Sequence, residues 1–146
     1  MKHIKQILFI VFTVFAMNAY SQYEQQQQFS YKRSSDGVRF LTKESFDANV
    51  KKPRVITIVE FWAGWNEVNQ CTFLKKISGV KVFRVDMEAS PDLGLKYGIS
   101  VVPTILVFDG GKLREKFEGN LMFQLPPDVN KKALQNVVDD IIGEKF

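Results

Sequence analysis

The sequence predicts an α/β fold in which a mixed central sheet is sandwiched between helices. An apolar, β-branched run at residues 55–62 is typical of a central strand that is covered on both faces. Segments with strand and helix periodicity alternate along the chain, and an antiparallel hairpin signal follows them. This order combines parallel crossovers with a hairpin, which predicts a mixed sheet.

The first half of the domain is predicted to form strand, helix, strand and helix in turn. Residues 38–41 form a short strand, and Thr42 can cap a helix through Val50. Pro53 lies beyond the end of that helix, and the central strand at residues 55–62 follows. Residues 66–77 are then expected to form a helix, because apolar residues recur there with helical spacing.

The second half begins with an apolar strand at residues 80–85. Ser90 precedes a proline at the first helical position, which predicts a helix to about Tyr97. Two strands, at residues 103–108 and 112–118, flank a glycine-rich turn. Asp128 is expected to cap a final amphipathic helix.

The N-terminus has the features of a secretory signal peptide at residues 1–21. Lysines precede a short apolar run, and small residues allow cleavage between Ser21 and Gln22. The alternative is an uncleaved membrane anchor. Cleavage would leave a flexible Gln-rich leader at residues 22–36 and a domain at residues 37–146. We expect a periplasmic or secreted protein of the Gram-negative envelope, with no stable membrane insertion after cleavage.

Composition narrows the classes of function. Without the lysines of the signal peptide, 18 basic and 16 acidic residues remain, a net charge of +2, and no basic stripe predicts binding to nucleic acid. Cys71 is the only cysteine, so no intrachain disulfide can form. The single histidine lies in the signal peptide, which argues against a zinc or haem site. We expect no metal and no cofactor.

Several separated segments resemble the thioredoxin family, in the family's order. They cover its first helix, the strand before its active site, its centre, its cis-proline segment and its hairpin turn. The matching segments are Leu41–Asp47, Val59–Trp65, Val85–Asp86, Lys96–Ile99, Val101–Thr104 and Phe108–Lys112. The resemblance implies a thioredoxin-like fold from Gly37 to Phe146, and a cis-proline at Pro103.

The resemblance also places the family's functional positions on this chain. Its two active-site cysteines fall on Asn66 and Asn69, which cannot form a thiolate, so disulfide exchange is unavailable there. Its buried acid falls on Glu60. The positions that would line the family's peptide groove are Trp65, Glu67, Val68, Val102, Pro103, Gly119 and Asn120. Residues 121–127 form a longer insert than the family has.

Two residues have a chemical and a structural interpretation. Cys71 could be a displaced nucleophile or could link two chains by a disulfide, but its place on an apolar stripe favours a buried thiol. Glu60 in an apolar strand would have a raised pKa. Without an adjacent thiol we favour a structural role, with a hydrogen bond to Asn66, Asn69 or a buried water.

The function that the sequence favours is binding of an extended polypeptide or an envelope protein by a degenerate, non-catalytic groove. Trp65 is expected at the surface of that groove and Trp62 in the core. Met122, Phe123 and Leu125 could extend an apolar rim or fold back onto the core. The alternatives are a monothiol oxidoreductase that uses Cys71 and a structural subunit of an envelope complex.

Overall fold

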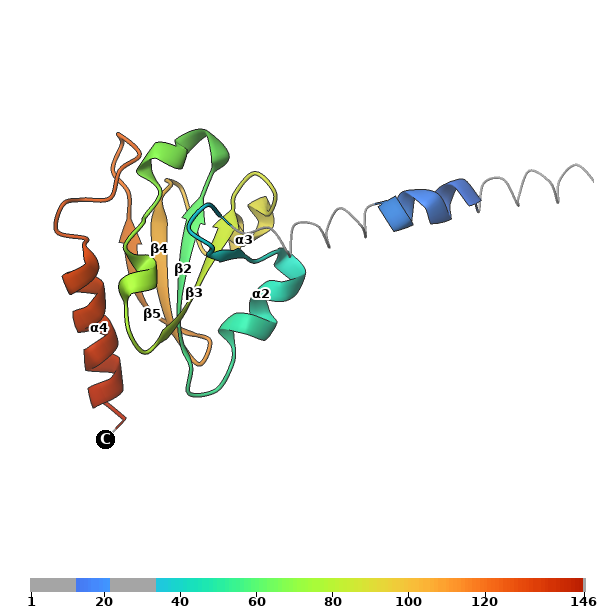
Figure 1. Ribbon diagram of the computed structural model, residues 1–146. Coiled ribbons are helices and arrows are strands. Elements are labelled where there is room, and N and C mark those ends of the chain that lie inside the picture. The colour runs from blue at the N-terminus through green and yellow to red at the C-terminus, as the bar shows by residue number, and fades with distance from the viewer. Residues whose placement is uncertain (1–12, 22–33, 146) are drawn as a thin grey trace, which may run out of the picture.

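The computed structural model describes residues 13–21 and 34–145. A five-stranded sheet with the order β1-β3-β2-β4-β5 forms the centre of the domain. Helix α4 covers one face, and helices α2 and α3 cover the other (Figure 1). The strands are β1 Arg39–Phe40, β2 Ile56–Trp62, β3 Val80–Asp86, β4 Thr104–Asp109 and β5 Lys112–Glu118. The helical elements are α2 Lys43–Val50, η1 Gly64–Asn69, η2 Leu74–Lys76, α3 Pro91–Lys96 and α4 Lys131–Gly143.

The sheet is mixed, as the sequence predicts. β1 and β2 both pair with β3 in parallel, whereas β4 pairs antiparallel with β2 and with β5. All seven residues of β2 are buried, because side chains of a central strand meet helices on both faces. The continuous β-branched run of β2 is therefore explained by its central position.

Alternate residues of the strands supply two separate cores. Val59 and Phe61 of β2 pack with Phe46 of α2 on one face, and Ile56 and Ile58 of β2 pack with α4 on the other. Trp62 is buried, as expected. The two cores fix the register of the sheet, since a slip by one residue would exchange the two faces.

Helix α2 begins as predicted, and helix α4 does not. The Thr42 hydroxyl accepts a hydrogen bond from the backbone N–H of Ser45, which completes a capping box. The cap of α4 is Asn130, whose side chain accepts from the N–H groups of Lys132 and Ala133, so the expectation of Asp128 is wrong by two residues. Asp128 belongs to a turn in which Val129 N–H donates to the Pro126 carbonyl.

The expected helix at residues 66–77 does not form. Two short 3₁₀ turns, η1 and η2, replace it. The backbone N–H of Cys71 donates to Oε1 of Glu60 at 2.8 Å, so it is not available to a carbonyl one turn earlier. The carbonyl of Cys71 accepts from Arg84 at 2.9 Å. These two tertiary hydrogen bonds interrupt the helical ladder that the apolar spacing predicted.

The N-terminal predictions are only partly within the described residues. Residues 13–21 are helical, and no described helix has the length and apolarity needed to cross a membrane. The rest of the predicted signal peptide and residues 22–33 of the predicted leader lie outside the described residues. Ser34 and Asp36, expected in that leader, pack against β3 through Arg84, so the packed part of the domain includes residues before Gly37.

Candidate functional site

The two asparagines at the expected exchange positions are bound to the protein itself. Asn66 is 4% exposed, and its Nδ2 donates to the carbonyl of Phe123 at 2.9 Å and, more weakly, to that of Val102 at 3.4 Å. Its Oδ1 accepts from Nδ2 of Asn69 at 2.8 Å. The Asn66 amide therefore has partners for both its donor and its acceptor atoms, and it ties η1 to the loop at residues 120–125.

The proline segment has the geometry that the resemblance implies. The Val102–Pro103 peptide bond is cis, and both residues are buried. The N–H of Gly119 donates to the Pro103 carbonyl at 2.9 Å. A Cβ at position 119 would lie 2.8 Å from that same oxygen, so only glycine fits the close approach of the two backbones.

Asn120 organises the loop that follows. Its Oδ1 accepts from the N–H groups of Met122 at 2.8 Å and Gln124 at 3.2 Å. Phe123 has a φ of +57°, a conformation that bulky residues rarely adopt and that costs about 1–3 kcal/mol. The hydrogen bond from Asn66 to the Phe123 carbonyl helps to offset this cost. Asn120 therefore serves the loop rather than an open groove.

Exposed apolar side chains gather on η1 and on this loop. Trp65 is 59% exposed and Val68 is 90% exposed, with Glu67 exposed between them. The Trp65 and Phe123 rings meet edge to face, with centroids 4.9 Å apart. We call the exposed apolar set of Trp65, Val68, Leu121, Met122 and Phe123 the rim patch. Exposed apolar patches commonly mark interaction sites.

The structure divides the three apolar residues of the insert. Met122 and Phe123 lie on the rim patch, whereas Leu125 packs against the core on the α4 side. Exposure at Trp65 and burial at Trp62 agree with the sequence analysis. Of the seven expected groove positions, four are open to solvent, one is half-buried and two are buried. The exposed ones are Trp65, Glu67, Val68 and Asn120, the half-buried one is Gly119, and the buried ones are Val102 and Pro103.

A buried ionic cluster holds the backbone of Cys71, two residues after η1. Arg84 of β3 is fully buried, and its Nε donates to Oε2 of Glu60 at 2.6 Å. Nη1 donates to Oδ1 of Asp36 at 2.7 Å and to Ser34 Oγ. Nη2 donates to Oδ2 of Asp36 at 2.9 Å and to the Cys71 carbonyl. All five N–H groups of the guanidinium therefore have acceptors. We call Asp36, Glu60, Arg84 and the backbone of Cys71 the Arg84 cluster.

The cluster explains the protonation behaviour of its acids. Burial raises the pKa of Glu60, and the guanidinium of Arg84 opposes that rise. Burial alone would also raise the pKa of Asp36, but hydrogen bonds from Arg84, Ser34 and Val38 hold that pKa well below its ordinary value. The expected hydrogen bond from Glu60 to Asn66 or Asn69 is wrong, because Arg84 and the Cys71 N–H take its two oxygens.

Cys71 is buried as the favoured interpretation predicts. Its side chain is 4% exposed and packs with the core on the α4 side. Burial, together with the nearby charge of Glu60, raises the pKa of the thiol to about 12. Both effects oppose formation of the thiolate, which is the reactive form. Within the described residues, no three His, Cys, Asp or Glu side chains gather so as to hold a metal ion.

The sequence analysis missed Arg84 and the role of Asp36. A signal for Arg84 was present, because a lone arginine inside an apolar strand is rarely buried without a partner. The register of β2 and β3 places Glu60 directly beside Arg84. Pairing the single acid of β2 with the arginine of β3 would have identified the ion pair, but Asp36 gave no such signal.

Comparisons with known proteins agree with the geometry. Residues 37–129 match the family model "Thioredoxin". The chain is 31% identical to a thioredoxin of Rickettsia bellii over 84 residues, covering 51% of this chain and 78% of the relative. It is 33% identical to human protein disulfide-isomerase A6 over 120 residues, covering 75% of this chain but only 27% of that longer protein.

Solved structures show the same fold at low sequence identity. A mutant thioredoxin from Halobacterium salinarum NRC-1 superposes with a TM-score of 0.56 at 19% identity. The match covers 75% of this chain and 94% of that thioredoxin. A designed protein superposes with a TM-score of 0.55 at 20% identity. The match covers 70% of this chain and 94% of the designed protein. The mixed sheet with helices on both faces is therefore a thioredoxin-like fold.

Proposed function

This chain belongs to the thioredoxin family, and from that premise we propose that it is a non-catalytic member that holds an extended polypeptide of the bacterial envelope. The observation that carries the proposal is the rim patch. Five exposed apolar side chains gather beside the position where the family keeps its thiols, and the chain has asparagines at both thiol positions.

Loss of the thiols supports binding over exchange. Disulfide exchange requires a thiolate that attacks a disulfide sulfur, and an asparagine side chain cannot do so. Cys71 does not replace it, because burial keeps this thiol protonated. We therefore do not propose the monothiol oxidoreductase or a dimer linked through Cys71.

The rim patch favours contact through side chains. Trp65 is a large exposed aromatic residue, and such residues commonly carry much of the energy of an interface. The backbone of Val102, which would pair with a peptide in a β-augmentation mode, is buried and accepts the weak hydrogen bond from Asn66. A bound segment would thus lie over Trp65 and Phe123.

The envelope location is part of the proposal. It rests on the charged, apolar and small-residue order of residues 1–21. Cell fractionation and N-terminal sequencing of the exported protein test it, and a mature N-terminus at Gln22 is expected. Recovery of the uncleaved chain in the cytoplasm would contradict it.

The binding proposal is tested by capture of polypeptides from an envelope extract with the isolated protein and two variants. Trp65→Ala should lose the captured partners. Leu95→Ala removes a comparably exposed apolar side chain, 82% exposed, on α3 outside the rim patch, and should retain them. Capture that is equal for both variants would refute the proposal. The protein should also fail to reduce insulin disulfides.

The structural-subunit alternative gives a different result in the same experiment. A permanent subunit would co-purify with one partner in fixed stoichiometry, whereas a polypeptide-binding module would release its partners on dilution. The exposed Leu121 and Met122 of the insert are the side chains that such a permanent interface would bury.

A further inference from the structure

The sheet has an open edge on β3, at the opposite end of that strand from the Arg84 cluster. β1 pairs with β3 only through Arg39 with Phe83 and Phe40 with Arg84. The same register, extended backward, would place Val38 beside Val82 and Asp36 beside Val80. The chain instead turns at Gly37, whose N–H donates to the Ser34 carbonyl, and Asp36 binds Arg84.

The direction of the free backbone groups follows from the alternation of the strand. The Arg84 carbonyl points toward β1, since it accepts from the N–H of Leu41 at 2.7 Å. Backbone groups alternate in direction along a strand, so Val82 and Val80 also point their N–H and C=O groups toward this edge, whereas Lys81 points them toward β2. The bridge between Arg39 and Phe83 uses the Val82 carbonyl as acceptor, so the free groups are the Val82 N–H and the N–H and C=O of Val80. No described strand lies beside Val80.

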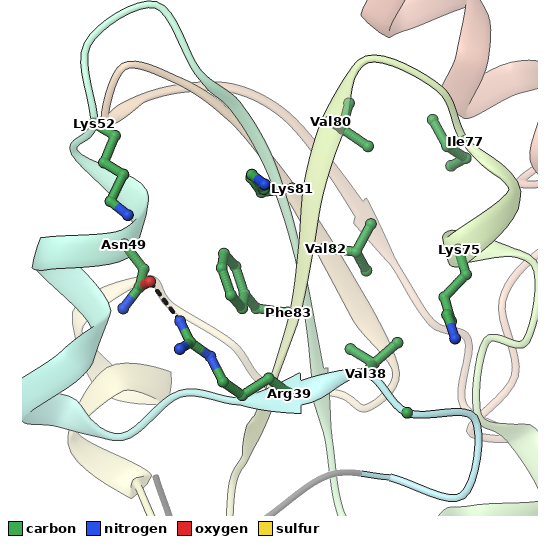
Figure 2. Close-up of a pocket in the computed structure, with 11 residues that line it drawn as sticks. Val38, Arg39, Asn49, Lys52, Lys75, Ile77, Val80, Lys81, Val82 and Phe83 are labelled. Carbon is green, nitrogen blue, oxygen red and sulfur yellow. Dashed lines mark hydrogen bonds between the residues drawn. The ribbon is translucent and has the colours of Figure 1, made fainter. Parts of the chain in front are cut away.

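The edge forms the floor of a basic groove of about 480 Å³ (Figure 2). Basic side chains stand on both sides of β3, and the lining contains no acidic residue. The four cations are Arg39, Lys52, Lys75 and Lys81. The side chains of Lys52 and Lys81 make no ion pair or hydrogen bond within the described part of the chain, and Lys75 donates only to the backbone carbonyl of Asp36 at 2.6 Å.

We propose that the open edge at Val80–Val82 binds an extended polypeptide segment with acidic side chains, which adds to the sheet as a strand beside β3. The free N–H and C=O groups supply main-chain hydrogen bonds, and the four cations select acidic side chains. This site is separate from the rim patch and does not depend on the function proposed there.

Charge argues against a second copy of this chain as the occupant. Pairing two β3 edges would bring the lysines of both copies together, and like charges across paired strands are destabilising. An acidic strand would instead neutralise Lys52 and Lys81. The occupant is therefore a polypeptide of opposite charge.

The test uses the isolated protein and a short fluorescent peptide that alternates glutamate and valine. Binding is followed by fluorescence anisotropy at low and high salt, and it should weaken as salt screens the charges. A peptide with lysine in place of glutamate should not bind. The acidic peptide with N-methylated backbone amides, whose charge is unchanged, should bind at least about tenfold more weakly, because it cannot complete a strand ladder.

Amide hydrogen exchange gives the site-specific readout. The acidic peptide should slow exchange at Val82 and Val80 and leave Lys81 unchanged, since the Lys81 N–H already faces β2. Binding without this protection, or equal binding by the N-methylated peptide, would overturn the proposal. A dimer that forms in sedimentation experiments without peptide, and protects the same amides, would identify a second copy as the occupant and would also overturn it.

Charge-reversal variants complete the experiment. Lys52→Glu combined with Lys81→Glu should weaken peptide binding by about tenfold or more. Lys131→Glu combined with Lys132→Glu makes the same change of charge on exposed residues of α4 and should leave affinity within about twofold. Trp65→Ala should leave it unchanged, so failure here and failure of the rim-patch proposal are distinguishable.

Discussion

Two layers at this end of the sheet have opposite character. The lower, buried layer is the Arg84 cluster, which holds one cation and two carboxylates, with Arg84 and Glu60 fully buried. The upper layer is the rim patch, which includes Trp65 and Val68 of η1 and leaves five apolar side chains open to solvent. Buried charges and an exposed apolar patch are both departures from the usual distribution, which is apolar inside and polar outside.

This difference indicates separate roles. The Arg84 cluster fixes the chain at Cys71, and the rim patch is exposed for contact. Every donor of the Arg84 guanidinium is hydrogen-bonded, so the cluster rigidifies the chain from Cys71 back to β2. The rim patch has no comparable cover among the described residues. Asn66 holds the loop of the rim patch, since its side chain donates a hydrogen bond to the Phe123 carbonyl.

The cluster also accounts for what Glu60 does without thiols. A buried acid that assists proton transfer needs a free oxygen beside the reacting group. Here Oε1 accepts from the Cys71 N–H and Oε2 from Arg84, so both oxygens have protein partners. Glu60 therefore acts as a structural anchor of the loop.

The largest expected effect concerns Cys71, the buried thiol at the lower layer. Its pKa is raised from 9.0 to about 12, so at neutral pH the thiolate fraction falls about a thousandfold, and burial restricts access further. Alkylation of the native protein should therefore be more than about a thousandfold slower than in denaturant. Val68→Cys supplies an exposed thiol in η1 as the control and should react at once. A native rate within about tenfold of the denatured rate would contradict this burial.

The next effect tests the cluster directly. Arg84→Met leaves Glu60 buried without its cation, and removing one partner of a buried pair costs about 3–5 kcal/mol. Urea unfolding measures the loss. Adding Glu60→Gln to Arg84→Met should recover part of the stability, because the fully buried charge of Glu60 is then absent and only that of Asp36 is left without its cation. Lys51→Met, which breaks an exposed pair with Asp47, should change little. Equal stability of Arg84→Met and the wild type would refute the role of the cluster.

The third effect is a pH dependence from Asp36. The pKa of Asp36 is depressed in the folded protein, so its stabilisation is fully present above its unfolded pKa of about 4 and declines as pH falls toward the lower folded pKa. At neutral pH, the free energy of unfolding of the wild type should exceed that of the Asp36→Asn variant by about 2 kcal/mol. This difference should shrink between about pH 4 and pH 2. The raised pKa of Glu60 acts in the opposite sense, but it is present in both proteins.

The smallest effect concerns the hydrogen bond from Asn66 to the loop of the rim patch. Asn66→Ala removes the hydrogen bond to the Phe123 carbonyl and should cost about 1 kcal/mol. Amide exchange at Met122 and Phe123 should become faster. Asn69→Ala removes only the hydrogen bond to Asn66 Oδ1, so it should have a weaker effect on the same amides. Unchanged exchange in Asn66→Ala would show that the loop holds its position without η1.

The sequence by itself determined the central strand, the alternation of strands and helices, and the absence of thiols at Asn66 and Asn69. These features depend on residue type and on spacings of two to four residues, which local backbone geometry reads directly. The capping of α2 by Thr42 belongs with them, since the cap and its partner Ser45 lie three residues apart.

Only the tertiary structure decided three features: the interruption of the expected helix at Cys71, the partners of Glu60, and the hydrogen bond from Asn66 to the Phe123 carbonyl. These contacts join residues 11 to 57 positions apart, such as Glu60 with Cys71, Glu60 with Arg84 and Asn66 with Phe123. A buried carboxylate must find a cation or a donor wherever the fold brings one near, and this requirement overrides the local preference for a helix. Periodicity contains no information on such partners, because it describes only neighbours along the chain.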